Sequence, residues 1–518
     1  MAINFQAGKN PLLLCLLALL LLAPSLASAQ SDDAYAAYER KDVAALARMG
    51  KTEDPIAQNN LGYMYRYGTG VVKDDTAAVS WWRRAADQGN VDAQNNLGNM
   101  YENGAGIDQD YTEALKWYRK AADQGYAYAQ SNLGNMYQNG RGIVRDDAIA
   151  VSWFRRAADQ GNAVAQTSLG VMYNDGRGVA KDDAIALSWY RKAAEQGYAV
   201  AQYNLGYMYQ GGTGVTQNYE LAASWFRKAA DQGYAVAQYN LGYMYRDGRG
   251  IAKDYAIAAS LFRKAADQGD LNAQHTLGFM YDKGEGVEQD YTEAVKWYRK
   301  AADQGNADAQ YNLGVIYQGG TGVTQNYELA ASWFRKAADQ GDAVAQYTLG
   351  FMLEKGQGAT QDYSDAVSWF RKAAVQGNAD AQVSLGMMYS EGKGITKDYA
   401  IAVSWYRKAA EQGHPNAEFN LGLMYQYGRS IVQDYELAVS WYQKAAGRGQ
   451  ADAQNNLGYM YANGLGVAKS YVQAHKWYNL SAASGTEMAK ANRDSLAAKM
   501  TSIQITEAQR LARAWVKR

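Results

Sequence analysis

Apolar and polar residues follow one another along this chain with the period of a helix, and the same arrangement returns at a fixed interval. Between Asp110 and Gln138, the first apolar residues are spaced i, i+3, i+4 and i+7: Ala114, Trp117, Tyr118 and Ala121. This spacing predicts an amphipathic helix of about 13 residues. Asp110, with Glu113 three residues later, is typical of a helix N-terminus with a capping box.

A second helix is predicted to begin near Ala127. It places four apolar side chains on one face: Ala129, Leu133, Met136 and Tyr137. Gly125 favours the left-handed end of the first helix. Gly134 lies inside the second helix, where glycine costs about 1 kcal/mol relative to alanine. Its presence there indicates close contact with another helix, and a Gly-x-Gly loop from Gly140 then leads to the next cap.

This pair of helices is one unit of a long array. The motif Ala-Gln-x-x-Leu-Gly returns every 36 residues, with Glu in place of Gln once, at Ala57, Ala93, Ala129, Ala165, Ala201, Ala237, Ala273, Ala309, Ala345, Ala381, Ala417 and Ala453. A constant period of this length is typical of a solenoid whose units bury one another's apolar faces. We therefore predict an all-α fold: an α-solenoid of about twelve 36-residue helix-turn-helix repeats forming a superhelix.

A column of aromatic residues runs through the helices that correspond to the one predicted after Asp110. Leu261 is its one aliphatic member, and the others are Trp81, Trp117, Trp153, Trp189, Trp225, Trp297, Trp333, Trp369, Trp405, Trp441 and Trp477. An aromatic at fixed helical spacing is more often packing than a ligand site. We expect this column to fill the groove between helices.

The repeat motifs also carry a resemblance. Ala-x-x-x-Leu-Gly-x-x-Tyr, a Gly-x-Gly loop, Asp-Tyr and Ala-x-x-Trp-Tyr/Phe-x-Lys-Ala-Ala resemble the Sel1-like repeat family, a relative of the tetratricopeptide repeats, over residues 57 to 485. The resemblance implies an α-solenoid that acts as a protein-interaction scaffold. Some exported family members carry cysteines in each repeat and have been associated with binding or cleaving β-lactams, whereas these repeats have none. Ser430 replaces the second glycine of one loop, and we expect a distorted turn there.

The ends of the chain differ from the repeats. Lys9, the apolar run Leu12–Leu22 and the small residues Ala27–Ala29 predict a signal peptide, residues 1–29, and hence a periplasmic or secreted protein. The apolar run is shorter than the roughly 20 residues that span a bilayer, so no transmembrane segment is expected. The single cysteine, Cys15, lies within it.

Beyond the signal peptide, three segments are predicted: an N-terminal helical cap over residues 30–56, twelve repeats over 57–485 and a C-terminal helical cap over 486–518. In the last segment Arg493 and Asp494 stand where the repeat has leucine and glycine. A last helix is expected after Thr506.

Composition and motifs argue against several functions. Lysine plus arginine equals aspartate plus glutamate, at 52 each, so no net field would attract nucleic acid. The three histidines, His275, His414 and His475, fall in separate repeats, which makes a shared metal site or catalytic triad improbable. Because nucleophile-elbow, zinc-protease and phosphate-loop motifs are also missing, we predict no catalytic, cofactor or metal residues and no enzyme.

The candidate site lies on helices that begin near the Ala-Gln motif. Positions two and six after its alanine lie opposite the packed side of the helix. Position two is polar in the first four repeats, as Asn59, Asn95, Ser131 and Thr167. The candidate partner-binding residues, from the fifth repeat to the ninth, are Tyr203, Tyr207, Tyr239, Tyr243, His275, Phe279, Tyr311, Tyr347 and Phe351. The alternative is that these rings pack against the next repeat.

By resemblance to tetratricopeptide-like solenoids, these helices line a concave surface. A ladder of aromatic rings there would suit an extended peptide or a glycan chain. Residues 209–233 are identical to residues 317–341, which indicates that a three-repeat block was duplicated. The leading hypothesis is therefore an exported scaffold that binds a partner protein or peptide. The alternatives are a hydrolase acting on β-lactams or cell-wall peptides, and a scaffold for exopolysaccharide export.

Overall fold

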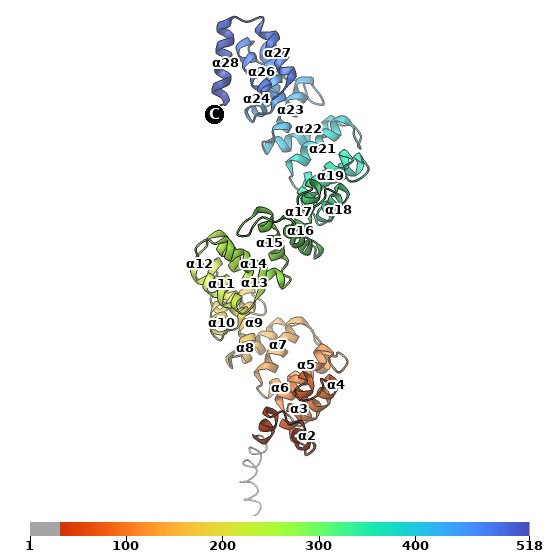
Figure 1. Ribbon diagram of the computed structural model, residues 1–518, viewed down its shortest axis with the longest axis vertical. Helices are drawn as coiled ribbons and strands as arrows, with labels where there is room; N and C mark the ends of the chain where they lie inside the picture. The colour runs from red at the N-terminus through yellow and green to blue at the C-terminus, as the bar shows by residue number, and fades with distance from the viewer. Residues whose placement is uncertain (1–31, 517–518) are drawn as a thin grey trace, which may run out of the picture. The chain divides into compact units, whose positions relative to one another are not determined.

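The computed structural model describes residues 32–516, and every regular element in that range is a helix (Figure 1). The chain divides into two compact units, which we call unit 1, ending at Ala265, and unit 2, beginning at Ala266. Each unit is a succession of antiparallel helix pairs, so the predicted all-helical solenoid is confirmed within each of them. A helical segment, residues 32–39, and α2 (Val43–Lys51) precede the first pair.

Twelve helix pairs follow. The first helices of the pairs, here called the A helices, are α3 (Pro55–Tyr67), α5 (Val91–Asn103), α7 (Ala127–Asn139), α9 (Ala163–Asp175), α11 (Ala199–Gly211), α13 (Ala235–Asp247), α15 (Leu271–Lys283), α17 (Ala307–Gly319), α19 (Ala343–Lys355), α21 (Ala379–Glu391), α23 (Pro415–Tyr427) and α25 (Ala451–Asn463). The second helices, the B helices, are α4 (Asp75–Asp87), α6 (Tyr111–Asp123), α8 (Asp147–Asp159), α10 (Asp183–Glu195), α12 (Tyr219–Asp231), α14 (Tyr255–Asp267), α16 (Tyr291–Asp303), α18 (Tyr327–Asp339), α20 (Tyr363–Val375), α22 (Tyr399–Glu411), α24 (Tyr435–Gly447) and α26 (Tyr471–Ala483).

The helix ends are set by the residues that the sequence singled out. Asp110 caps α6, and its carboxylate accepts hydrogen bonds from the backbone N–H groups of Thr112 and Glu113. Gly125 follows α6 with a φ of 92°, a left-handed conformation that glycine adopts without strain. Helix α7 begins at Ala127, as predicted, and ends at Asn139; Gly140 caps it, and the Gly140 N–H donates to the Met136 carbonyl.

Inside each pair, the A-helix glycine meets an aromatic ring of the B helix. A Cβ added at Gly134 would lie 2.7 Å from the ring carbons of Phe154, so the close contact that this glycine predicted is confirmed. The ring belongs to the residue that follows the tryptophan column. This neighbouring position is buried in every repeat and consists of Trp82, Tyr118, Phe154, Tyr190, Phe226, Phe262, Tyr298, Phe334, Phe370, Tyr406, Tyr442 and Tyr478.

The tryptophan column is packed less deeply. Trp117, Trp189, Trp297, Trp333, Trp369 and Trp477 are buried, whereas Trp81, Trp153, Trp225, Trp405 and Trp441 are half-buried. A basic side chain one helical turn later covers the ring, as where the Lys120 ammonium lies 3.9 Å from the centre of the Trp117 ring. The column therefore packs, as expected, but its outer face also holds a cation by a cation–π contact.

Buried glutamines join each repeat to the one before it. The Gln382 amide donates a hydrogen bond of 3.1 Å to the Ala374 carbonyl at the end of the preceding B helix and accepts one of 2.9 Å from Gln412. Every other Gln of the Ala-Gln motif makes the same donation, with distances between 2.9 and 3.2 Å. These bonds give helix-end carbonyls a second donor, since each of those at the end of a B helix also accepts the N–H of the glycine that follows the helix or of a neighbouring residue, as Ala374 accepts from Gly377.

The eleventh repeat departs from this arrangement. Glu418 replaces the glutamine of the Ala-Gln motif, and Arg448 replaces the glutamine that corresponds to Gln412. Arg448 Nε lies 3.3 Å from Glu418 Oε1. The Glu418 side chain is 2% exposed, and its Oε2 has no hydrogen-bond partner among the described residues. One repeat junction thus lacks the donor that all the others contain.

Two expectations about the ends and loops change. The last helix, α28 (Ser502–Val516), begins before Thr506 because Thr501 and Gln504 form a reciprocal cap: the Gln504 N–H donates to Thr501 Oγ1, and the Thr501 N–H donates to Gln504 Oε1. Ser430 keeps the left-handed backbone of the glycine that it replaces, with a φ of 56°, so the predicted distortion of that turn is wrong.

Helix α28 follows α27 (Glu487–Ala497) and packs on α26, with the rings of Trp477 and Trp515 5.0 Å apart. The tryptophan that would meet a thirteenth repeat meets this helix instead. The predicted signal peptide, residues 1–29, lies outside the described residues. No helix between residues 32 and 516 has both the length and the apolar character needed to cross a membrane.

Candidate functional site

The nine candidate residues all lie on A helices. In unit 1 they come from α11 and α13, and in unit 2 from α15, α17 and α19. We call the side of the A helices that carries positions two and six the A-helix face. The two positions differ in exposure: the position-two rings are half-buried, whereas three of the four aromatic rings at position six are exposed.

Each position-two ring packs on the buried B-helix aromatic of its own repeat. The ring centres of Tyr203 and Phe226 are 5.7 Å apart, and those of Tyr347 and Phe370 are 5.8 Å apart. Tyr203 also contacts Tyr234, which precedes the next A helix, at 5.5 Å. Position two is therefore partly covered by packing, but the ring contacts lie within its own repeat, whereas the alternative expected contacts with the next repeat.

Position two also forms a polar ladder between neighbouring A helices. The Asn132 amide of α7 donates to Asn95 Oδ1 of α5 at 2.9 Å, and the Asn312 amide of α17 lies 3.0 Å from His275 Nε2 of α15. Burial lowers the pKa of the His275 imidazole, and the nearby Asp308 carboxylate opposes part of that effect. A neutral imidazole accepts the amide hydrogen, so His275 links α15 to α17 in the way that Asn95 links α5 to α7.

Position six is the accessible part of the A-helix face. Tyr207 is 59% exposed in unit 1, and Phe279 and Phe351 are 36% and 37% exposed in unit 2. The column continues beyond the repeats that sequence reasoning singled out. Its further apolar members are Tyr63 and Val171 in unit 1, and Val315, Met387, Leu423 and Tyr459 in unit 2. Following position six alone through all twelve repeats would have found them.

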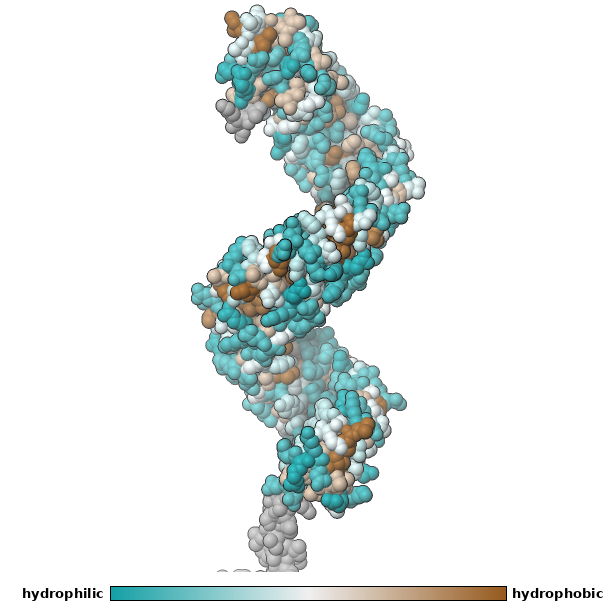
Figure 2. Space-filling view, viewed as in Figure 1, coloured by the Kyte–Doolittle hydropathy of each residue, from teal (hydrophilic) through white to brown (hydrophobic). Residues whose placement is uncertain are grey.

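The surface around these residues is mostly polar. In the space-filling view, hydrophobic residues appear as separate patches within a largely hydrophilic surface (Figure 2). Scattered exposed apolar residues are normal, but a column with an apolar member in ten of the twelve repeats is an ordered arrangement. Position six therefore carries apolar residues one repeat apart through all of unit 2 and over the last three repeats of unit 1.

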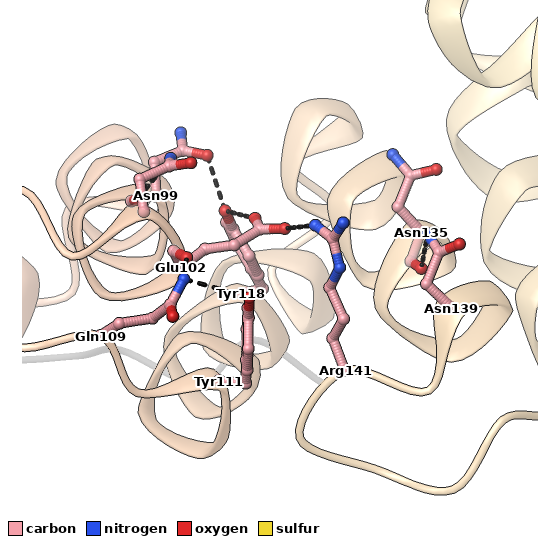
Figure 3. A network of polar contacts seen from close by, with 9 residues as sticks. Asn99, Glu102, Gln109, Tyr111, Tyr118, Asn135, Asn139 and Arg141 are labelled. Atoms are coloured by element: carbon pink, nitrogen blue, oxygen red, sulfur yellow. Dashed lines mark hydrogen bonds and ion pairs between the residues drawn. The ribbon is translucent and has the colours of Figure 1, made fainter. Parts of the chain in front are cut away.

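The second and third repeats are different, because polar side chains occupy the face there. The Tyr118 hydroxyl lies 2.8 Å from Glu102 Oε2 and 2.6 Å from Asn99 Oδ1, and Arg141 of the next loop pairs with Glu102 at 2.9 Å (Figure 3). Burial and the neighbouring Glu102 carboxylate raise the pKa of Tyr118, so its hydroxyl keeps its proton. The polar groups of this network bond to one another. The next apolar residue at position six in unit 1 is Val171.

The histidines do not meet. His275 belongs to the polar ladder, His414 precedes α23 with Nε2 3.0 Å from Asp380 Oδ1, and His475 is buried in α26. Among residues 32–516 there is no group of three or more His, Cys, Asp or Glu side chains that could hold a metal ion.

Comparison with known families identifies the repeat. The model of the Sel1 repeat matches residues 55–90, 91–126, 127–162, 163–198, 199–234, 235–270, 271–306, 307–342, 343–378, 379–414, 415–450 and 451–486. The chain belongs to the Sel1 repeat family. Its twelve repeats begin two residues before the alanines that mark the period in the sequence. Proteins of this family are solenoid scaffolds for interactions with other proteins, typically without catalytic activity.

A solved structure agrees with this assignment. The protective antigen c5321 of uropathogenic Escherichia coli, described as displaying an SLR fold, is 38% identical, with 92% of this chain and 94% of that chain covered and a TM-score of 0.64. A Sel1 repeat protein from Oxalobacter formigenes is 37% identical over 60% of this chain and 90% of that chain, with a TM-score of 0.48. Comparison with curated proteins gave no match.

Proposed function

We propose that this Sel1 repeat protein is an exported scaffold that binds an extended segment of a partner protein along the A-helix face. The observation that carries the proposal is the position-six column, which holds an apolar side chain in all six repeats of unit 2, five of them exposed, and in four of the six repeats of unit 1. Exposed aromatic residues supply large contact areas with little loss of conformational freedom and are enriched at protein interfaces. Contacts spaced one repeat apart suit a partner that lies along the face.

Export is part of the proposal because the first 29 residues have the charged, apolar and small-residue regions of a signal peptide. A glycan remains the second candidate partner, since tyrosine rings also stack on sugars and their hydroxyls form hydrogen bonds. A hydrolytic function gains no support from the arrangement of the histidines described above.

The test compares two double variants of residues 30–518. The first replaces Tyr207 and Phe351 by serine, and the second replaces Val375 and Val432, which are 72% and 87% exposed but lie away from position six. Both exchanges remove exposed apolar groups, so neither should unfold the chain. In pull-downs from a periplasmic extract, a protein retained by the parent and the valine variant but lost from the first variant supports the proposal. Equal retention by both variants contradicts it.

A further inference from the structure

The A-helix face of unit 2 carries charges of one sign beside its apolar row. The residue before the Ala-Gln motif lies on this face, within about 20° of position six on a helical wheel. In unit 2 this position holds Asp308 on α17, Asp380 on α21 and Asp452 on α25, all exposed. Aspartate therefore returns in every second repeat, in line with the exposed apolar column.

Cations of the same face do not neutralise these carboxylates. Lys283 pairs with the adjacent Asp282 at 2.8 Å, and Lys355 pairs with the adjacent Glu354 at 2.9 Å. Asp380 faces His414 Nε2. No ion pair within residues 32–516 involves Asp308 or Asp452, although Asp452 Oδ2 accepts a hydrogen bond of 3.3 Å from the neutral Gln450 amide. The unpaired charge on the A-helix face of unit 2 is therefore negative.

Unit 1 does not share this feature. There the same position is mostly apolar, and its six members are Ile56, Asp92, Tyr128, Val164, Val200 and Val236. Its one carboxylate, Asp92, accepts a hydrogen bond of 2.6 Å from the Tyr126 hydroxyl. The contrast makes unit 1 an internal control for the charge of unit 2.

We infer that the A-helix face of unit 2 selects a basic extended peptide, with apolar residues against position six and lysine or arginine side chains against the three aspartates. This inference rests on the proposed function and names the chemistry of the partner. Complementary charge beside an apolar row gives both specificity and faster association. An acidic or neutral segment would leave the carboxylates unpaired.

The spacing defines the peptide further. Axes of packed helices lie about 8–10 Å apart, so aspartates two repeats apart are separated by roughly 16–20 Å. An extended chain advances about 3.3 Å per residue, which makes this distance about five or six residues. Of these two spacings only six fits, because side chains an even number of residues apart point to the same side of an extended chain. The fitting partner therefore has a basic residue at about every sixth position.

The experiment measures fluorescence anisotropy of two labelled peptides with the full mature chain. Both are rich in valine and serine, and they differ in carrying either three lysines or three glutamates, six residues apart. We expect the lysine peptide to bind more tightly than the glutamate peptide at low salt. Replacing Asp308, Asp380 and Asp452 by asparagine should weaken the lysine peptide about tenfold, the size expected for three exposed ion pairs. Asp92→Asn should leave its affinity unchanged.

The possible results separate this inference from the proposed function. If both peptides bind equally and Phe351→Ser weakens both, the face binds peptides without charge selection, so the inference fails and the proposed function stands. If the lysine peptide does not bind, or binds the asparagine variant as well as the parent, basic selection is refuted. If Asp92→Asn weakens binding as much as the three exchanges in unit 2, the assignment to unit 2 is wrong.

Discussion

The exchange Glu418→Gln should stabilise the protein, because it restores a hydrogen bond that eleven other repeats possess. Glutamine at this position would donate to the Ala410 carbonyl, as Gln382 donates to Ala374 at 3.1 Å. In the native chain, Glu418 Oε2 is buried and lacks a partner. The substitution therefore removes one unsatisfied buried acceptor and adds one donor.

The magnitude follows from three contributions. A buried hydrogen bond adds about 1 kcal/mol, and an unsatisfied buried polar atom costs about 1–3 kcal/mol. The ion pair with Arg448 is lost, but the arginine side chain is 54% exposed, so the loss is at most about 1 kcal/mol after screening by solvent. Because the new amide oxygen still accepts from Arg448, we expect a net gain of about 1–2 kcal/mol.

Hydrogen exchange followed by mass spectrometry is the suitable assay, because stability in a solenoid is local and is shared between neighbouring repeats. Amides of α22, α23 and α24 should exchange about five- to thirtyfold more slowly in Glu418→Gln. The mirror variant, Gln382→Glu, should accelerate exchange in α20 and α21. Unchanged or faster exchange in Glu418→Gln would refute the reasoning, since it would show that Oε2 already has a donor.

Two further predictions concern the core and the polar ladder. Gly134→Ala should destabilise the protein by about 1–3 kcal/mol in urea unfolding, because the new Cβ would lie 2.7 Å from the Phe154 ring. Gly447→Ala is the control: its new Cβ meets nothing within 4 Å at the end of α24, so it should stabilise the protein by up to about 1 kcal/mol. Loss of stability in both variants would contradict the packing argument. Burial lowers the pKa of His275 in the folded protein. The contribution of this residue to stability is therefore full above the unfolded pKa of about 6.5 and is lost as the pH falls through the folded pKa. Unfolding measured from pH 7 to pH 5 should thus depend less on pH in His275→Asn, which reproduces the Asn95 pair of the second repeat; an unaltered pH dependence would exclude this histidine as its source.

Much of the fold could be predicted from the sequence because its signals are local. The 36-residue period, the caps at Asp110 and Gly140 and the close contact at Gly134 each depend on a few adjacent residues, and the structure confirms them. The depth to which each side chain is buried was harder to predict from the sequence. Trp117 and Tyr118 both lie on the apolar stripe of one helix, and only the position of the partner helices makes Tyr118 the more deeply buried of the two.

The candidate site was only partly accessible to sequence reasoning for the same reason. Helical spacing places Tyr203 and Tyr207 on one face, but packing on Phe226 covers part of Tyr203 and leaves Tyr207 exposed. The hydrogen bond between Asn132 and Asn95 joins residues 37 positions apart, a separation that no local pattern reveals. Ser430 shows the converse, since the tight turn holds a serine in the backbone conformation of glycine.

The central claim is that partners lie along the A-helix face, and site-specific photo-crosslinking tests it most directly. A photoreactive phenylalanine analogue would replace Phe351 of α19 in one variant and Val375, the exposed last residue of α20, in another. After irradiation in a periplasmic extract, the account predicts crosslinked partner bands from position 351 and none from position 375. Equal crosslinking from both positions, or crosslinking from position 375 alone, would contradict it.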